Sequence, residues 1–214
     1  MTLEDLDFHV ARTRRELESA YGLVHTSYER AGLVDAHGTG LRFGPHNFLP
    51  DTRTFVATLH GDVVATVTLV FDSPLGLPMD AVYGDVLGPL RADGRRLVEV
   101  TMLADRRASG RRTLPIVLRL TKILFDYARE QAESDDLVVA VHPRHQAFYE
   151  RLLYFEAIGE RRSYVSVRGN PAVALRLDLI DVAERCRDDA RVQRLYFSQP
   201  TPAETFADPL RLTD

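Results

Sequence analysis

The alternation of short apolar runs with longer amphipathic runs is the feature that most constrains this fold. Short alternating or continuous apolar runs predict strands, and runs with apolar residues every three to four positions predict helices. Along the chain the order is strand, helix, two or three strands, helix, strand, helix, two strands. This order predicts an α/β (α+β) fold with a mixed sheet. We expect one domain over residues 1–180, followed by a helical extension and tail over residues 181–214.

The individual elements follow from the same patterns. Strands are expected at residues 7–13, 97–103 and 136–141, in a hairpin that turns at His60–Asp62, and in a last hairpin across Gly169–Asn170. Helices are expected at residues 14–34, 113–133 and 143–155. Pro115 should lie in a first helical turn, where its missing N–H costs nothing. Residues 73–96 read as a loop with a short helix, and the Pro/Thr-rich tail should be loosely held.

The composition excludes several classes of protein. The formal net charge is −4, which argues against a general nucleic-acid binder. The single cysteine, Cys186, cannot form an intrachain disulfide, and a reducing cytoplasm fits. No run reaches the ~18 apolar residues of a membrane span, and the acidic N-terminal stretch lacks the pattern of a signal peptide. We therefore expect a cytoplasmic protein without a membrane span.

One carboxylate, Glu99, lies in the middle of an otherwise apolar run, "LVEVTML". Strand alternation puts it on the same face as Thr101. A buried carboxylate must find a cation, take up a proton or line a solvated cleft. One interpretation is an ion pair with one of the many arginines. The other is a general base, whose pKa burial would raise towards the working pH.

An arginine-rich loop, "DRRASGRRT", joins that strand to the next helix. The N-terminus of a helix exposes N–H groups, and Gly110 allows a ligand to approach the backbone. Arginines on either side of Gly110 add positive charge. This loop is therefore either an anion site or a solvated basic segment, and Ser109 and Thr113 are most simply helix caps.

The strand, loop and helix together resemble the acyl-thioester site of the GNAT superfamily. Its loop reads Q/R-x-x-G-x-G/A, and the stretch from Arg107 through Gly110 matches the first half. Arg112 stands where the second small residue is usual. "HQAFYERLLYFEAIGE" resembles the late GNAT motif, with Tyr154 in place of the usual glycine and Phe155 retained.

Three longer blocks narrow the resemblance to the long-chain N-acyl amino acid synthase family, relatives of the acyl-homoserine-lactone synthases. They are "PHNFLPDTRTFVAT", "DSPLGLPMDAVYGDVLGPLRADGRRLVEVTMLA" and "HPRHQAFYERLLYFEAIGE", and they span roughly residues 44–180 in the family's order. The resemblance implies a GNAT acyltransferase fold, with a mixed, mostly antiparallel sheet and splayed central strands. It also implies a fatty acyl thioester carried by acyl carrier protein, and an amino-acid acceptor.

The matching positions carry the expected site. Glu99 and Thr101 match the acid-x-Ser/Thr element, with Glu99 as base and Thr101 orienting the acceptor or a water. Backbone N–H groups near Met102–Ala104 could stabilise the oxyanion. We expect the donor to be bound by the end of this strand and by the loop: Met102, Leu103, Ala104, Arg107, Ser109, Gly110, Arg111 and Arg112.

Four other residues remain open between two roles. Tyr149 lies near the place of a general-acid tyrosine in many GNAT enzymes, and a core position is the alternative. His46 either anchors its loop or contacts the acceptor. His142 and His145 either shape the end of a strand or face the acceptor pocket. A metal is not expected at these histidines, because no third ligand has a suitable spacing.

We therefore expect a direct N-acyltransferase with no tightly bound cofactor, in which the acyl thioester is a co-substrate. Two alternatives stay open. One is an acyl- or acetyl-coenzyme A-dependent GNAT enzyme. The other is a GNAT-like protein that binds acyl carriers without catalysis.

Overall fold

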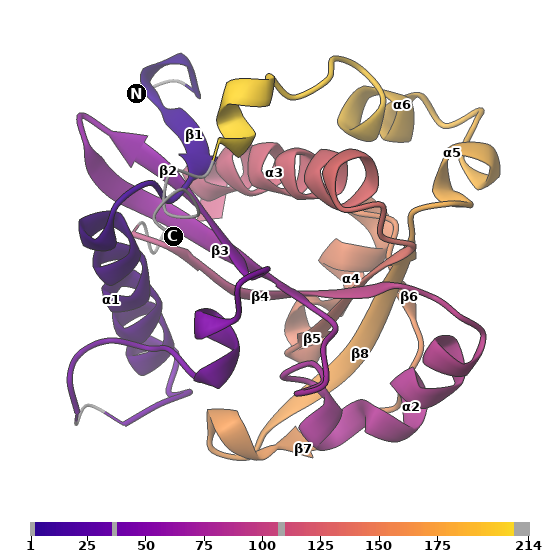
Figure 1. The fold of residues 1–214 in the computed structure, drawn as a ribbon, viewed down its shortest axis with the longest axis horizontal. Helices are drawn as coiled ribbons and strands as arrows, with labels where there is room; N and C mark the ends of the chain where they lie inside the picture. Colours follow the sequence, from indigo (N-terminus) through magenta and orange to yellow (C-terminus); the bar gives the residue numbers. More distant parts are fainter. Residues whose placement is uncertain (1–2, 36–37, 107–109, 208–214) are drawn as a thin grey trace. The chain divides into compact units, whose positions relative to one another are not determined.

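The computed structural model describes residues 3–35, 38–106 and 110–207, with the side chains of residues 110–113 outside this description (Figure 1). The chain divides into two compact units, each built from separated segments. The first unit contains residues 1–69, 101–121 and 201–214, and the second contains residues 70–100 and 122–200. Three elements contribute to both units: β3 (Asp62–Phe71), β4 (Leu97–Asp105) and α3 (Gly110–Asp126).

In the first unit an antiparallel sheet carries one long helix. Strand β1 (Asp7–Val10) pairs with β2 (Arg53–Leu59), and β2 pairs with β3. The predicted hairpin is confirmed, and its turn uses His60 and Gly61, both with positive φ. Short 3-10 turns lie at η1 (Leu3–Asp5), η2 (Pro45–Phe48) and η5 (Ala203–Phe206).

Helix α1 (Arg14–Arg30) begins at a complete capping box. The Thr13 side chain accepts a hydrogen bond from the Glu16 N–H, and the Glu16 carboxylate accepts one from the Thr13 N–H. Ala20 of this helix is buried against the β2 and β3 valines Val56 and Val63. The amphipathic pattern and the cap therefore place α1 against this sheet.

In the second unit the central strand is β5 (Asp136–Val141). It pairs in parallel with the start of β4, over the three residues Leu97–Glu99, and along its whole length with the antiparallel β8 (Asn170–Asp178). Two short strands, β6 (Glu156–Ala157) and β7 (Arg162–Tyr164), also pair with β8. The last hairpin is confirmed, although η4 (Val165–Val167) takes the place of half the expected strand. The parallel pairing is short, as expected of splayed central strands, so the sheet is mixed and mostly antiparallel.

Helices complete the second unit: α2 (Asp80–Ala92), the end of α3, the π turn η3 (Tyr127–Gln131), α4 (Pro143–Leu152), α5 (Val182–Arg185) and α6 (Ala190–Tyr196). Helix α2 is longer than the sequence suggested. Its buried residues Tyr83 and Leu87 join a core cluster with Leu97 and Val138 of the sheet. This burial favours helix despite the glycines and Pro89 in the segment.

Tyr154 stands where the late GNAT motif usually has glycine, and its backbone conformation is one that glycine favours. Its φ is 60°, a left-handed conformation that glycine adopts readily and other residues at a cost of about 1–2 kcal/mol. The Tyr154 hydroxyl donates to the Asp189 carboxylate at 2.6 Å. The buried Tyr196 of α6 donates its hydroxyl to the Leu153 carbonyl. These bonds connect the C-terminal extension to the end of α4.

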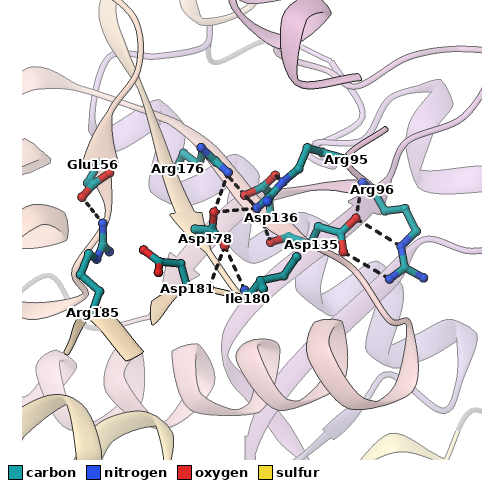
Figure 2. Close-up of polar contacts among 10 residues, drawn as sticks. All are labelled: Arg95, Arg96, Asp135, Asp136, Glu156, Arg176, Asp178, Ile180, Asp181 and Arg185. Atoms are coloured by element: carbon teal, nitrogen blue, oxygen red, sulfur yellow. Dashed lines mark hydrogen bonds and ion pairs between the residues drawn. The ribbon is translucent and has the colours of Figure 1, made fainter. Parts of the chain in front are cut away.

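A network of arginines and aspartates joins β5 and β8 (Figure 2). The Asp136 side chain is fully buried and accepts hydrogen bonds of 2.6 Å from Arg95 and Arg176. Both arginines also pair with Asp178. These contacts raise the pKa of Arg95, with the Asp136 hydrogen bond as the main cause.

Two local expectations were wrong. Helix α3 begins at Gly110, so Pro115 lies in its second turn and not in the first. The tail segment is not loosely held up to residue 207. Thr201 and Thr205 are buried, and the Arg12 guanidinium donates to the Glu204 carbonyl.

None of the helices in the described residues is long and apolar enough to cross a membrane. The predicted domain boundary at residue 180 stays a prediction.

Candidate functional site

Glu99 is buried on β4 with a single backbone donor. Its side chain is 2% exposed, and its Oε2 accepts the Met79 N–H at 2.8 Å. Met79 immediately precedes α2, and both it and Leu97 belong to the apolar core of the second unit. None of the arginines whose side chains the structure describes pairs with Glu99. Among the described side chains Glu99 therefore has no cation partner, and an ion pair with an arginine of the loop lies outside the described residues.

Burial decides the protonation of this carboxyl. Desolvation raises the pKa of Glu99 to about 8, the Met79 N–H opposes this, and the nearby Asp80 carboxylate adds to it. A carboxyl with such a pKa exists in both protonation states near neutral pH. It can therefore accept a proton and release it again, which is what a general base requires.

The rest of β4 departs from a regular strand at Met102. This buried residue has a φ of +55°, and its sulfur accepts a hydrogen bond from the Asn47 side chain at 3.2 Å. Thr101 and Leu103 are half-buried, whereas Ala104 is buried beside α1. A left-handed residue inside a strand turns its neighbouring N–H groups out of the ladder. Met102 thus contacts the η2 segment that also carries His46.

The basic loop is described only in part. Arg107 and Ser109 lie outside the described residues. Gly110, Arg111 and Arg112 form the start of α3, and their side chains lie outside the description as well. The backbone therefore shows that α3, the next helix after β4, begins at Gly110, while the contacts of these arginines remain a prediction.

The two histidines after β5 take part in the start of α4. His142 is the N-cap, and its Nδ1 accepts the Arg144 N–H at 3.2 Å. The Arg144 side chain donates to His145 Nε2 at 3.0 Å. Desolvation and the neighbouring charges of Arg144 and His142 lower the pKa of His145. No group of three metal-ligating side chains occurs in the described part of the chain. The geometry fits the shaping of the strand end, and the acceptor role stays a prediction.

The remaining two candidates differ in their surroundings. Tyr149 is buried, with the rings of Phe148 and Phe155 5.6 and 5.5 Å from its own, edge to face. This environment is typical of a core tyrosine, and its role as an acid stays a prediction. His46 accepts the Thr52 hydroxyl through its carbonyl, which anchors the η2 loop. Its buried Nε2 has no hydrogen-bond partner among the described residues.

The structure distributes these residues over the two units. Glu99, His142, His145 and Tyr149 belong to the second unit, and His46, Thr101 and the residues of the donor site belong to the first. The sequence analysis missed Met79, whose N–H binds Glu99, Asp80, whose charge acts on Glu99, and Tyr164, whose hydroxyl binds the Pro78 carbonyl. A signal for Asp80 existed, because an aspartate after an apolar Leu-Pro-Met segment is typical of a helix start.

Solved structures of acyltransferases share this fold. FeeM, an N-acyl amino acid synthase from uncultured soil microbes, matches with a TM-score of 0.73 at 23% identity, over 90% of this chain and 94% of its own. The acyl-homoserine lactone synthase LasI matches with a TM-score of 0.67 at 15% identity, over 92% and 97%. The coenzyme A-dependent synthase BjaI matches with a TM-score of 0.59 at 13% identity, over 94% and 96%. The fold is that of the GNAT-like acyltransferases.

The family is given by a sequence model. The model described as "N-acyl amino acid synthase FeeM" matches residues 19–178, which is most of the chain. The chain belongs to this family and is an acyltransferase. No curated protein matches it.

Proposed function

We propose that the chain transfers a fatty acyl group from the thioester of acyl carrier protein to the amino group of an amino acid, with Glu99 as the general base. One observation carries the assignment. Glu99 is a fully buried carboxyl without a described cation partner, and burial raises its pKa to about 8. Family membership supplies the reaction type.

The reaction is a direct transfer. Glu99, directly or through a water oriented by Thr101, takes a proton from the acceptor ammonium. The amine lone pair then attacks the thioester carbonyl carbon, which forms the C–N bond. N–H groups of Met102–Ala104 stabilise the oxyanion. The intermediate collapses with loss of the second proton from the attacking nitrogen and cleavage of the C–S bond. The thiolate takes up a proton, for which Tyr149 is the candidate donor, and the proton released from the nitrogen restores the donor, so that one proton moves from nitrogen to sulfur overall.

The substitution Glu99→Gln tests the base. It keeps the shape of the side chain and removes its basicity. We expect turnover to fall by roughly 10²–10⁴-fold, the usual contribution of a general base. Glu156→Gln is the matched control, because Glu156 is exposed and pairs with Arg185. A folded Glu99→Gln enzyme that turns over like the control would refute the assignment.

The proposed acyl donor follows from the arginines in the loop before α3. Coenzyme A carries a pyrophosphate that needs small residues close to the backbone, and Arg112 stands at one such position. Arginines there would instead attract an acidic carrier protein. Their effect on the encounter rate falls as the screening length drops from ~10 Å at 0.1 M salt to ~3 Å at 1 M. Because BjaI is a coenzyme A-dependent synthase, acyl-coenzyme A is the natural competing donor.

The donor experiment compares kcat/KM for acyl carrier protein and acyl-coenzyme A at low and high salt. We expect the carrier protein to be preferred, with a steep decrease at high salt, and charge reversal at Arg111 or Arg112 should mimic that decrease. A short acyl-pantetheine should be nearly insensitive to salt. Better efficiency with acyl-coenzyme A at low salt would favour the coenzyme A-dependent function.

The acceptor is proposed to be an amino acid whose α-carboxylate pairs with a cation, with His46, His142 and His145 as candidate contacts. A charge-assisted hydrogen bond to the carboxylate orients the amine. Tyrosine should therefore be a better acceptor than tyramine. Equal rates for the two would exclude carboxylate recognition.

We propose that this reaction takes place in the cytoplasm, with residues 1–180 as the acyltransferase domain and residues 181–214 as its extension.

A further inference from the structure

The amide that binds Glu99 is itself held by a second hydrogen bond. The peptide between Pro78 and Met79 donates its N–H to Glu99 Oε2 at 2.8 Å. The carbonyl of the same peptide accepts the Tyr164 hydroxyl at 3.1 Å. Tyr164 comes from β7 and packs against the core cluster that contains Met79. The Tyr164 hydroxyl and the Glu99 carboxylate are therefore connected through one peptide group.

The other side of this peptide is fixed by Asp80. Its Oδ2 accepts the Leu77 N–H at 2.6 Å, which closes a tight turn around the Pro78–Met79 peptide. The Arg91 guanidinium forms two hydrogen bonds with Asp80, of 2.7 and 2.6 Å, and a second pair with Asp72. Gly76 completes the turn, since a Cβ there would lie 2.7 Å from Asp80 Oδ2.

From these contacts we infer that Tyr164 and Asp80 are positioning residues for Glu99, which act through the Pro78–Met79 peptide and set the orientation and basicity of the carboxylate. This inference rests on the proposed function of Glu99. A hydroxyl that donates to a peptide carbonyl polarises the N–H of the same peptide, and the bond from that N–H to a carboxylate becomes stronger. Tyr164 therefore favours the ionised form of Glu99, whereas the negative charge of Asp80 favours the protonated form.

The other described groups of the second unit do not compete with Tyr164 and Asp80 for this positioning role. The core cluster that contains Met79 has apolar strand residues, among them Leu97, Val138, Ala140, Ala172 and Ala174. Tyr83 lies in the same cluster, but its hydroxyl donates to the carbonyls of Glu160 and Ala172. The described charged groups next to the peptide are Asp80 and, beyond it, Arg91 with Asp72.

The test uses two matched pairs of variants. Tyr164→Phe removes only the hydroxyl that holds the Pro78 carbonyl, and Tyr83→Phe removes a hydroxyl of the same cluster that binds elsewhere. Asp80→Asn removes the charge beside Glu99. Asp85→Asn makes the same change on the same helix, where Asp85 pairs with Arg162 at 2.6 and 2.8 Å.

The readout is the ionisation midpoint of Glu99, measured by infrared titration and assigned by the signal lost in Glu99→Gln. One hydrogen bond corresponds to roughly half a pH unit, or about a threefold change in the ionisation constant. We expect the midpoint to rise by this amount in Tyr164→Phe and to fall by a similar amount in Asp80→Asn. It should stay unchanged in Tyr83→Phe and Asp85→Asn. The midpoint of kcat/KM should follow.

The outcomes separate the two proposals. If Tyr164→Phe and Asp80→Asn leave the infrared midpoint where their controls leave it, the positioning role is wrong, whatever the activity. If the midpoint moves as expected but Glu99→Gln retains full turnover, Glu99 is not the base and the proposed function fails, although the positioning of the carboxyl stands. A shift in stability alone, shared with the control variants, would indicate a purely structural role and overturn the inference.

Discussion

Two buried carboxylates on neighbouring strands of the second unit have opposite environments. The register pairs Leu97 with Asp136 and Glu99 with Val138, so both carboxylates lie on the face of the sheet that carries Leu97 and Val138. Asp136 is fully buried between two arginines. Glu99 is also buried, but its described hydrogen bond comes from one N–H, and the charge of Asp80 raises its pKa further.

The comparison distinguishes a buried carboxylate with a structural role, Asp136, from one that titrates near neutral pH, Glu99. A buried carboxylate that is surrounded by guanidinium groups has its charge compensated, and it fixes the strands and turns that carry its partners. A buried carboxylate without a cation keeps its proton to a higher pH. The Asp136 carboxylate thus connects the strands and turns that carry its arginines. The Glu99 carboxyl, which lies opposite Val138, two residues further along, is instead a titrating group.

The largest expected effect concerns the free energy of unfolding of Asp136→Asn. This variant leaves Arg95 and Arg176 with less compensation, and we expect a loss of about 3 kcal/mol. The same isosteric change in Glu99→Gln, measured beside it by urea denaturation at pH 5, should cost less than about 1 kcal/mol. If both variants lose the same stability, the two carboxylates do not differ as described.

The next effect is the pH dependence of catalysis. With the pKa of Glu99 near 8 in the free enzyme, its ionised fraction increases about fiftyfold between pH 6 and pH 8. The value of kcat/KM should increase in proportion and level off above pH 8. Asp136→Asn, assayed at a temperature where it is folded, should have the same midpoint. A profile that is flat from pH 6 to pH 8 would contradict the role of Glu99.

The comparison also predicts how stability changes with pH. The pKa of Glu99 is raised in the folded protein, so the unfolded chain loses this proton above about pH 4.5 and the folded chain only near pH 8. The contribution of Glu99 to stability is therefore lost as the pH increases through this window. Relative to Glu99→Gln, the wild type should lose roughly 3 kcal/mol between pH 5 and pH 8. A constant difference between the two proteins over this range would mean that burial does not raise this pKa.

The smallest effect is expected at the rim of the arginine–aspartate network. Arg96 pairs with Asp135 and Glu133, but its side chain is 56% exposed, and water screens these pairs. Arg96→Gln should shift the melting temperature by less than about 2 °C, even at low salt. A shift as large as that of Asp136→Asn would show that burial is not what distinguishes the members of the network.

Much of the fold could be predicted from the sequence because its signals are local. The hairpin at His60–Gly61, the capping box of α1 and the strand at Asp136–Val141 depend on residues close together in the chain. Helix α2 was underestimated, since its glycines and proline disfavour helix locally and its stability comes from burial of Tyr83 and Leu87. The buried tail residues Thr201 and Thr205 were missed for the same reason.

The sequence by itself determined the class of the fold, the family and the presence of an acid in an apolar strand. It could not determine which partner that acid has. The Met79 N–H that binds Glu99 lies 20 residues away, and the Tyr164 hydroxyl that holds the same peptide lies 86 residues from Pro78. Such pairs depend on strand register and on the packing of α2 against the sheet. Many arginines could have paired with Glu99 or Asp136, and only the tertiary structure assigned two of them to Asp136 and, among the described residues, gave Glu99 a backbone amide.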